Sequence, residues 1–79
     1  MITIYKYPIG KVSMPKGAKV LTVDVKVGEF YLWAEVDTDA PLEEREFHVY
    51  GTGYPLPDNR CYIATVFENV FVWHVYEVV

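Results

Sequence analysis

Residues 71–78 read Phe71-Val72-Trp73-His74-Val75-Tyr76-Glu77-Val78, near the end of the chain. Side chains of a strand alternate between its two faces, and here both faces carry apolar or aromatic residues. A strand of this kind has to be covered on both sides. We therefore expect it at the centre of a closed barrel or a sandwich, or at a subunit interface.

The rest of the chain has the same strand character. Alternating β-branched and aromatic residues, bounded by glycine and proline, predict strands over residues 2–7, 19–27, 30–36, 45–50, 62–67 and 70–78. Residues 10–17 are predicted to be a loop ending in a tight turn, and residues 37–44 a solvated loop or one helical turn. The pattern predicts an all-β single domain over residues 1–79, a small six-stranded antiparallel barrel or sandwich built from hairpins.

The alternation also predicts the core. One face of residues 19–36 is apolar, and it carries Leu21, Val23, Val25, Val27, Phe30, Leu32, Ala34 and Val36. In residues 45–50 the same alternation turns Phe47 and Val49 inward. We expect these side chains to form a layer rich in valine.

Four aromatic side chains fall on the opposite face by the same alternation: Tyr31, Trp33, His48 and Tyr50. If the consecutive strands 30–36 and 45–50 pair, the four rings form one continuous patch. The patch is then either a surface that stacks on bases or grips a partner's side chains, or a second core layer under the C-terminal strand. The sequence leaves both alternatives open.

A glycine loop follows the fourth of these aromatic residues. It reads Tyr50-Gly51-Thr52-Gly53-Tyr54-Pro55, and we use this name for these six residues below. Gly51 and Gly53 allow backbone conformations closed to other residues, while the tyrosines give the exposed backbone aromatic walls. Gly51, Thr52, Gly53 and Tyr54 are therefore candidate binding residues, although a simple turn or bulge in β structure is the more frequent reason for such glycines.

Charge and cysteine content limit the partners. Eleven acidic residues against seven basic ones give a net charge of −4, which repels a phosphate backbone, so we expect no nucleic acid partner. Cys61 is the only cysteine, and the chain begins without a basic segment followed by an apolar run, which favours a reducing compartment, by default the bacterial or host cytoplasm. No apolar run is long enough to cross a bilayer, so we expect no membrane association.

Catalytic and metal chemistry find little support in the sequence. His48, Cys61 and His74 lack the close spacing of structural zinc ligands, so we expect no metal and no cofactor. A Cys61 nucleophile would need an electropositive pocket, and only Arg60 is near in sequence. The acidic residues at 43–46 fit a solvated rim better than a pair of catalytic carboxylates. We expect a protein that is not an enzyme.

A resemblance to a known family covers nearly the whole chain. It rests on Ile4-Tyr5-Lys6-Tyr7-Pro8, on Met14-Pro15-Lys16-Gly17-Ala18-Lys19-Val20-Leu21, on Leu32-Trp33-Ala34, on the glycine loop and on Phe71-Val72-Trp73-His74-Val75. In these motifs the chain resembles a family of short, uncharacterised proteins encoded by phages and prophages. The resemblance implies a bacterial cytoplasm during infection and no established catalytic residue. Small phage accessory proteins of this kind often counter host defence by blocking a protein or sequestering a nucleotide signal.

Together these features favour a non-enzymatic binding protein that is encoded by a phage and is homo-oligomeric. Its partner would be a host protein or a nucleotide-like small molecule, held by the aromatic face and the glycine loop. The alternative is a structural or accessory phage β domain that has no small-molecule ligand.

Overall fold

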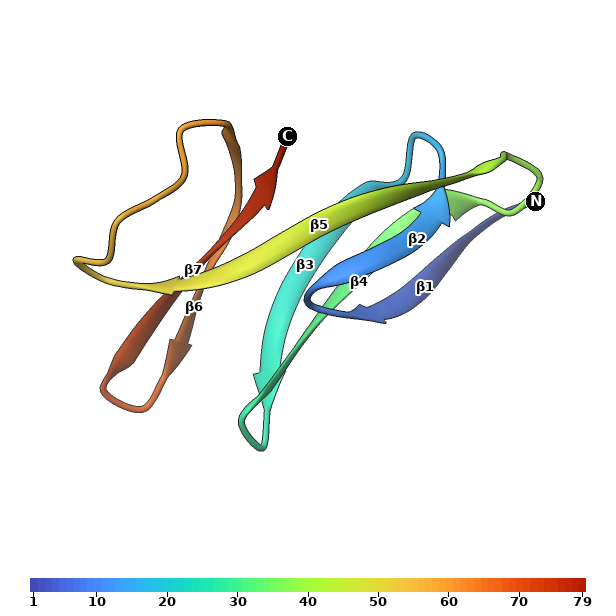
Figure 1. Ribbon diagram of the computed structural model, residues 1–79. Coiled ribbons are helices and arrows are strands. Elements are labelled where there is room, and N and C mark those ends of the chain that lie inside the picture. Colours follow the sequence, from blue (N-terminus) through green and yellow to red (C-terminus); the bar gives the residue numbers. More distant parts are fainter.

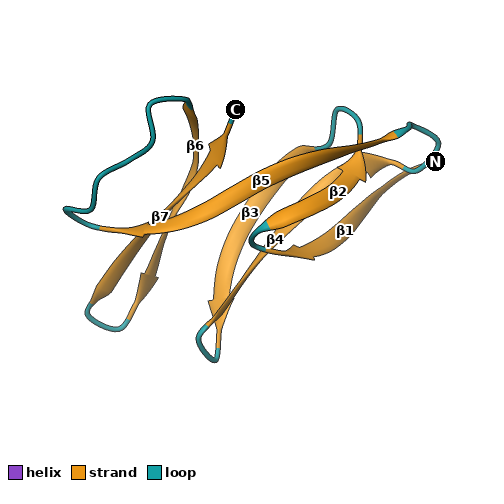
Figure 2. Cartoon of the chain, viewed as in Figure 1, coloured by secondary structure: helices purple, strands orange, loops and turns teal.

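The structure is a computed structural model that describes residues 1–79, and it contains seven strands and no helix (Figures 1 and 2). The strands are β1 (Ile2–Pro8), β2 (Lys11–Pro15), β3 (Lys19–Lys26), β4 (Glu29–Asp37), β5 (Leu42–Gly51), β6 (Arg60–Glu68) and β7 (Phe71–Val78). The all-β prediction is confirmed. The structure contains no helix that is long and apolar enough to cross a membrane.

The strands form two antiparallel sheets in a sandwich-like arrangement. One sheet has the order β1-β4-β3 and the other has the order β2-β5-β7-β6. The long strand β5 pairs with β2 through its first half and with β7 through its second half, so it extends along the whole second sheet (Figure 1). The sandwich prediction is confirmed and the closed barrel is wrong. β7 lies between β5 and β6, so the expected central position in a sheet is confirmed. Coverage of both faces is not: Val75 is buried in the core, whereas His74 and Tyr76 on the opposite face are only half-buried.

The predicted number of strands is one too few, because β2 lies where we expected a loop. Met14 in this strand is completely buried, while the strand backbone pairs with β5. Pairing with a distant strand therefore determines the conformation of a segment whose own pattern is weak. The segment after β4 forms no helical turn: Ala40 N–H donates to the carbonyl of Asp37 (3.1 Å), and β5 begins at Leu42.

The core lies between the two sheets. Its buried apolar side chains are Met14, Ala18, Val23, Leu32, Ala34, Val36, Phe47, Val66 and Val75. The predicted inward faces of β4 and β5 are confirmed at Leu32, Ala34, Val36 and Phe47. Val25 and Val49 are half-buried and pack against this core.

Two predicted core residues are exposed instead, Leu21 and Val27. A β-bulge interrupts the pairing between Val20 and Thr22, so Leu21 is an extra residue and the alternation changes phase there. Val27 lies outside the strand, in the two-residue turn that joins β3 to β4. A strict alternation of inward and outward residues predicts neither a bulge nor the start of a turn.

The turn at Val27 predicts a stabilising substitution. Both Val27 (φ 51°) and Gly28 (φ 77°) have positive φ, which a two-residue hairpin of type I′ requires. A β-branched residue is strained there, and Val27 is fully exposed, so it has no packing to lose. We expect Val27→Asn to raise the free energy of unfolding by about 1 kcal/mol in urea denaturation. Val70→Asn is the matched control: Val70 is an exposed valine in the turn between β6 and β7 whose own φ is not positive, and its substitution should change the free energy of unfolding by less than about 0.5 kcal/mol.

One ion pair connects distant parts of the sandwich. The guanidinium of Arg45 on β5 forms two hydrogen bonds with the carboxylate of Glu77 on β7, both at 2.8 Å. It also donates to the carbonyl of Ala18, in the turn before β3, at 2.6 Å. The hydrogen bonds with Glu77 raise the pKa of Arg45 above its ordinary value. The pair therefore holds the start of β3 against the second sheet.

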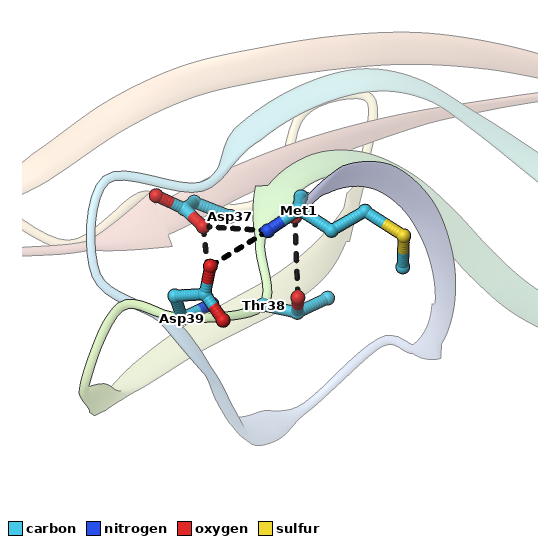
Figure 3. Close-up of polar contacts among 4 residues, drawn as sticks. All are labelled: Met1, Asp37, Thr38 and Asp39. Atoms are coloured by element: carbon cyan, nitrogen blue, oxygen red, sulfur yellow. Dashed lines mark hydrogen bonds and ion pairs between the residues drawn. The ribbon is translucent and has the colours of Figure 1, made fainter.

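The amino group of Met1 binds two carboxylates, those of Asp37 at the end of β4 and of Asp39 just after it (Figure 3). It donates to Asp39 at 2.9 Å and to Asp37 at 3.4 Å, while the Thr38 N–H donates to the Met1 carbonyl at 2.9 Å. These contacts fix the first residue of the chain beside the end of β4.

The same contacts predict a dependence of stability on pH. The hydrogen bond to Asp39 raises the pKa of the Met1 amino group above its ordinary value of 8.0. A raised pKa means that the stabilisation is complete below that ordinary value and is lost as the pH rises through the higher value in the folded state. We expect the urea midpoint of the 79-residue chain to fall in this alkaline range. Acetylation of the Met1 amino group should remove this part of the fall; an identical profile for both forms would contradict the prediction.

Candidate functional site

The predicted aromatic patch is divided between the two sheets. Tyr31 and Trp33 belong to β4, which pairs with β1 and β3, whereas His48 and Tyr50 belong to β5, which pairs with β2 and β7. All four side chains lie on the side of their strand opposite the core, as predicted, but the two strands do not pair. The continuous four-ring patch is therefore wrong, because the chain changes sheet between β4 and β5.

A row of tyrosines replaces it on the outer face of the second sheet. The tyrosine row consists of Tyr50 on β5, Tyr76 on β7 and Tyr62 on β6, one from each of three neighbouring strands. The ring centroids of Tyr50 and Tyr76 are 6.1 Å apart, and those of Tyr62 and Tyr76 are 5.5 Å apart, both edge to face. His48 extends the row beside Tyr50 at 6.3 Å. Tyr62 keeps 55% of its surface exposed, while Tyr50 and Tyr76 are half-buried, so the row is most accessible at Tyr62.

The glycine loop borders this row. β5 ends beside the beginning of β7, where Gly51 pairs with Trp73, and β6 begins beside the end of β7, where Arg60 pairs with Val78. The residues after the glycine loop therefore cross from one end of β7 to the other. Loop and strand enclose a pocket of about 220 Å³. Its lining residues are Gly51, Thr52, Gly53, Tyr54, Leu56, His74 and Tyr76. The loop pocket is thus continuous with the row at Tyr76.

Hydrogen bonds connect the loop to the row through His74. The Thr52 hydroxyl lies 2.9 Å from Nε2 of His74, and the Thr65 hydroxyl lies 3.3 Å from Nδ1. Thr65 in turn shares a hydrogen bond with the Tyr62 hydroxyl at 2.7 Å. Both ring nitrogens of His74 are therefore engaged, and its imidazole positions its neighbours rather than offering a free base.

Two glycine positions explain the shape of the loop. Gly53 has φ 91°, in the left-handed region that favours glycine, and the Tyr54 N–H donates to the Gly51 carbonyl at 3.1 Å. A Cβ atom at Gly51 would come within 3.2 Å of the Tyr54 ring and 3.6 Å of Trp73. The missing side chain at Gly51 lets the Tyr54 ring lie against the backbone, while 70% of Tyr54 remains exposed.

Charged groups stand at both ends of the row. His48 Nε2 lies 2.5 Å from a carboxylate oxygen of Glu46, and this hydrogen bond lowers the pKa of Glu46. At the other end, Arg60 precedes Tyr62 by two residues on the same strand face and donates to the Pro57 carbonyl at 3.0 Å. Arg60 therefore belongs to the same sheet face as Tyr62, which gives this face a positive charge although the chain as a whole is negative.

Tyr31 and Trp33 form part of a different surface. Trp33 borders a shallow groove of about 420 Å³ on the three-stranded sheet, together with Ile4 and Leu21. Tyr31 is engaged by its neighbours, since its hydroxyl donates to Glu29 at 2.6 Å and the Lys6 ammonium lies 4.6 Å from its ring centre. These two predicted site residues are therefore separate from the glycine loop.

The structure adds four residues that the sequence did not indicate as site residues: Tyr62, Thr65, His74 and Tyr76. The alternation does place His74 and Tyr76 on one face of β7. Their position beside Tyr50 depends on β7 lying next to β5, and the sequence does not reveal that order. No three histidine, cysteine, aspartate or glutamate side chains gather as metal ligands.

Comparison with known proteins gives a family but no described function. A family model described as a domain of unknown function, DUF7352, matches residues 1–79. No curated protein and no solved structure matches the chain significantly.

Proposed function

Because the chain belongs over its whole length to the DUF7352 family, a domain of unknown function, we propose its function from the geometry of the site. The protein is a non-enzymatic binding module that holds a nucleotide-like small molecule against the tyrosine row and the loop pocket. The observation that carries the proposal is the tyrosine contributed by each of three adjacent strands, directly beside the glycine loop.

Size and chemistry of the site support this class of ligand. Aromatic side chains on the face of a sheet stack on bases, and each stacked base contributes about 1–3 kcal/mol. The loop pocket, at about 220 Å³, is smaller than the roughly 300–1,000 Å³ of pockets for drug-sized molecules. It therefore suits a single ring, with the remainder of the ligand lying on the tyrosine row. Arg60 supplies a positive charge for a phosphate at one end.

The surroundings of the candidate catalytic groups support binding rather than catalysis. His74 uses both ring nitrogens in hydrogen bonds with Thr52 and Thr65. Cys61 is exposed and lies opposite Glu77, not a histidine, across the strand pair. Neither side chain is arranged as an activated nucleophile or base.

The proposal includes the origin that the sequence resemblance implies. In a phage- or prophage-encoded protein acting in the bacterial cytoplasm, the bound molecule would be a nucleotide signal of the host defence, and binding would sequester it. A second candidate is the blocking of a host protein, which the apolar groove at Ile4, Leu21 and Trp33 favours. A structural or accessory role without a ligand predicts no response to any metabolite.

A thermal-shift screen against cyclic dinucleotides and ADP-ribose derivatives tests the proposal. A ligand present at 100 times its dissociation constant adds about 2.7 kcal/mol to the free energy of unfolding, so the melting temperature should rise clearly with at least one compound. No shift with any nucleotide, at concentrations where the protein remains folded, would remove the nucleotide-like ligand from the proposal.

A further inference from the structure

We infer that β1 is an interface strand: its free edge pairs antiparallel with β1 of a second copy of this chain, so that two three-stranded sheets become one. β1 is the outermost strand of its sheet and pairs only with β4 (Figure 1). β2, the next strand in the chain, lies over β4 in the facing sheet. The free side of β1 has no strand beside it.

The hydrogen-bond pattern identifies which backbone groups are free. Ile9 N–H donates to the Phe30 carbonyl, and Thr38 N–H donates to the Met1 carbonyl, at opposite ends of the β1–β4 pair. Bonded and non-bonded pairs alternate along an antiparallel ladder, so the odd-numbered residues of β1 face β4. The N–H and C=O groups of Ile2, Ile4 and Lys6 consequently point away from the sheet. None of these groups takes part in a turn, loop or side-chain hydrogen bond.

The other three sheet edges offer less free and regular backbone than β1. β3 and β6 each contain a bulge, at Leu21 and at Ile63, and the two strands lie against each other. The same alternation on the short strand β2 turns Lys11, Ser13 and Pro15 outward, which leaves only two free N–H groups. β1 also turns a lysine and a proline outward, Lys6 and Pro8, but it keeps three free N–H groups, at Ile2, Ile4 and Lys6. Proteins commonly protect exposed edges with bulges, charges and proline. β1 is regular over its full pairing with β4, and Ile2 and Ile4 are 63% and 57% exposed.

A second copy fits this edge because β1 is complementary to itself. With Ile4 of the two copies directly opposite each other, Ile2 of one copy faces Lys6 of the other, and each of these pairs can exchange two hydrogen bonds. Every free N–H of the strand then has an acceptor. On the outer face no like charges meet, and on the inner face Thr3 lies beside Tyr5 of the other copy, a favourable pairing of β-branched and aromatic side chains. The pairing is isologous and closes on a twofold axis.

Sedimentation velocity over a range of concentrations, combined with amide hydrogen exchange, tests the inference. We expect a monomer–dimer equilibrium in which Ile2, Ile4 and Lys6 amides are protected in the dimer. Ile4→Lys places two ammonium groups opposite each other at the twofold axis and should weaken dimerisation roughly tenfold or more. Leu21→Lys is the matched control, because Leu21 is exposed on the same outer face but lies on β3. It should leave the dimer unchanged.

Circular dichroism and a urea midpoint near that of the unmodified chain establish that Ile4→Lys is folded. If Ile4→Lys does not fold, Ile4→Ser replaces it as the test variant, because it leaves the hydrogen bonds between β1 and β4 intact. The inference is overturned if the unmodified chain stays monomeric at every concentration, if a dimer forms while the three amides exchange freely, or if Leu21→Lys dissociates the dimer and Ile4→Lys does not. Protection that appears only when a different protein is added would assign the edge to another partner and would equally overturn pairing between copies. The result does not depend on a ligand at the tyrosine row.

Discussion

Arg45→Met should lower the free energy of unfolding by about 2–3 kcal/mol, just below the roughly 3–5 kcal/mol expected when one partner of a fully buried ion pair is removed, because this pair is largely but not completely buried. The side chains of Arg45 and Glu77 are only 16% and 13% exposed. The substitution leaves the Glu77 carboxylate in the sandwich without its two hydrogen bonds and leaves the Ala18 carbonyl without its donor. Surface pairs contribute far less, about 0–1 kcal/mol, so the size of the loss distinguishes a buried pair from an exposed one.

Urea denaturation of the single variant and of the double variant Arg45→Met with Glu77→Leu provides the measurement. Replacing a whole buried pair by apolar side chains is often neutral, so the double variant should recover most of the lost stability. A single-variant loss below about 1 kcal/mol would show instead that solvent screens this pair.

Tyr76→Ala should weaken binding of the nucleotide-like ligand roughly 5–150-fold, the equivalent of the 1–3 kcal/mol that one stacked base contributes. Tyr76 is the middle ring of the tyrosine row and also lines the loop pocket. Its removal therefore affects both parts of the site, whereas removal of Tyr62 affects only the row.

Trp33→Ala is the control for this prediction, because Trp33 lies on the other sheet. Isothermal titration with the nucleotide that gives the largest thermal shift supplies both affinities. Equal affinity in Tyr76→Ala and the unmodified chain, with the variant folded, would exclude the row from binding. A loss confined to Trp33→Ala would move the site to the groove on the three-stranded sheet.

Residue alternation predicted local features well. It placed Leu32, Ala34 and Phe47 inward, and these side chains are fully buried. It failed at Leu21, because a bulge inserts one residue without any mark in the sequence, and at Val27, because the hairpin turn uses a valine where glycine or asparagine is usual. Strand β2 was missed because its pairing with β5 comes from tertiary structure.

The candidate site could be predicted only in part for a related reason. The glycine loop and Tyr50 were recognisable, since glycines and aromatic residues carry local signals. The neighbours of Tyr50 are Tyr76 and, beyond it, Tyr62, which come from strands that follow later in the chain. Strand order is a property of the whole sheet, so consecutive strands β4 and β5 appeared to be neighbours when the chain in fact places them in different sheets.

A two-dimensional amide NMR titration of the chain with a cyclic dinucleotide or an ADP-ribose derivative tests the proposed site most directly. We expect the chemical shifts that change most to belong to Tyr50, Thr52, Tyr62, His74 and Tyr76, with little change at Ile4, Leu21 or Trp33. The opposite distribution, or a spectrum that no nucleotide alters, would contradict binding at the tyrosine row.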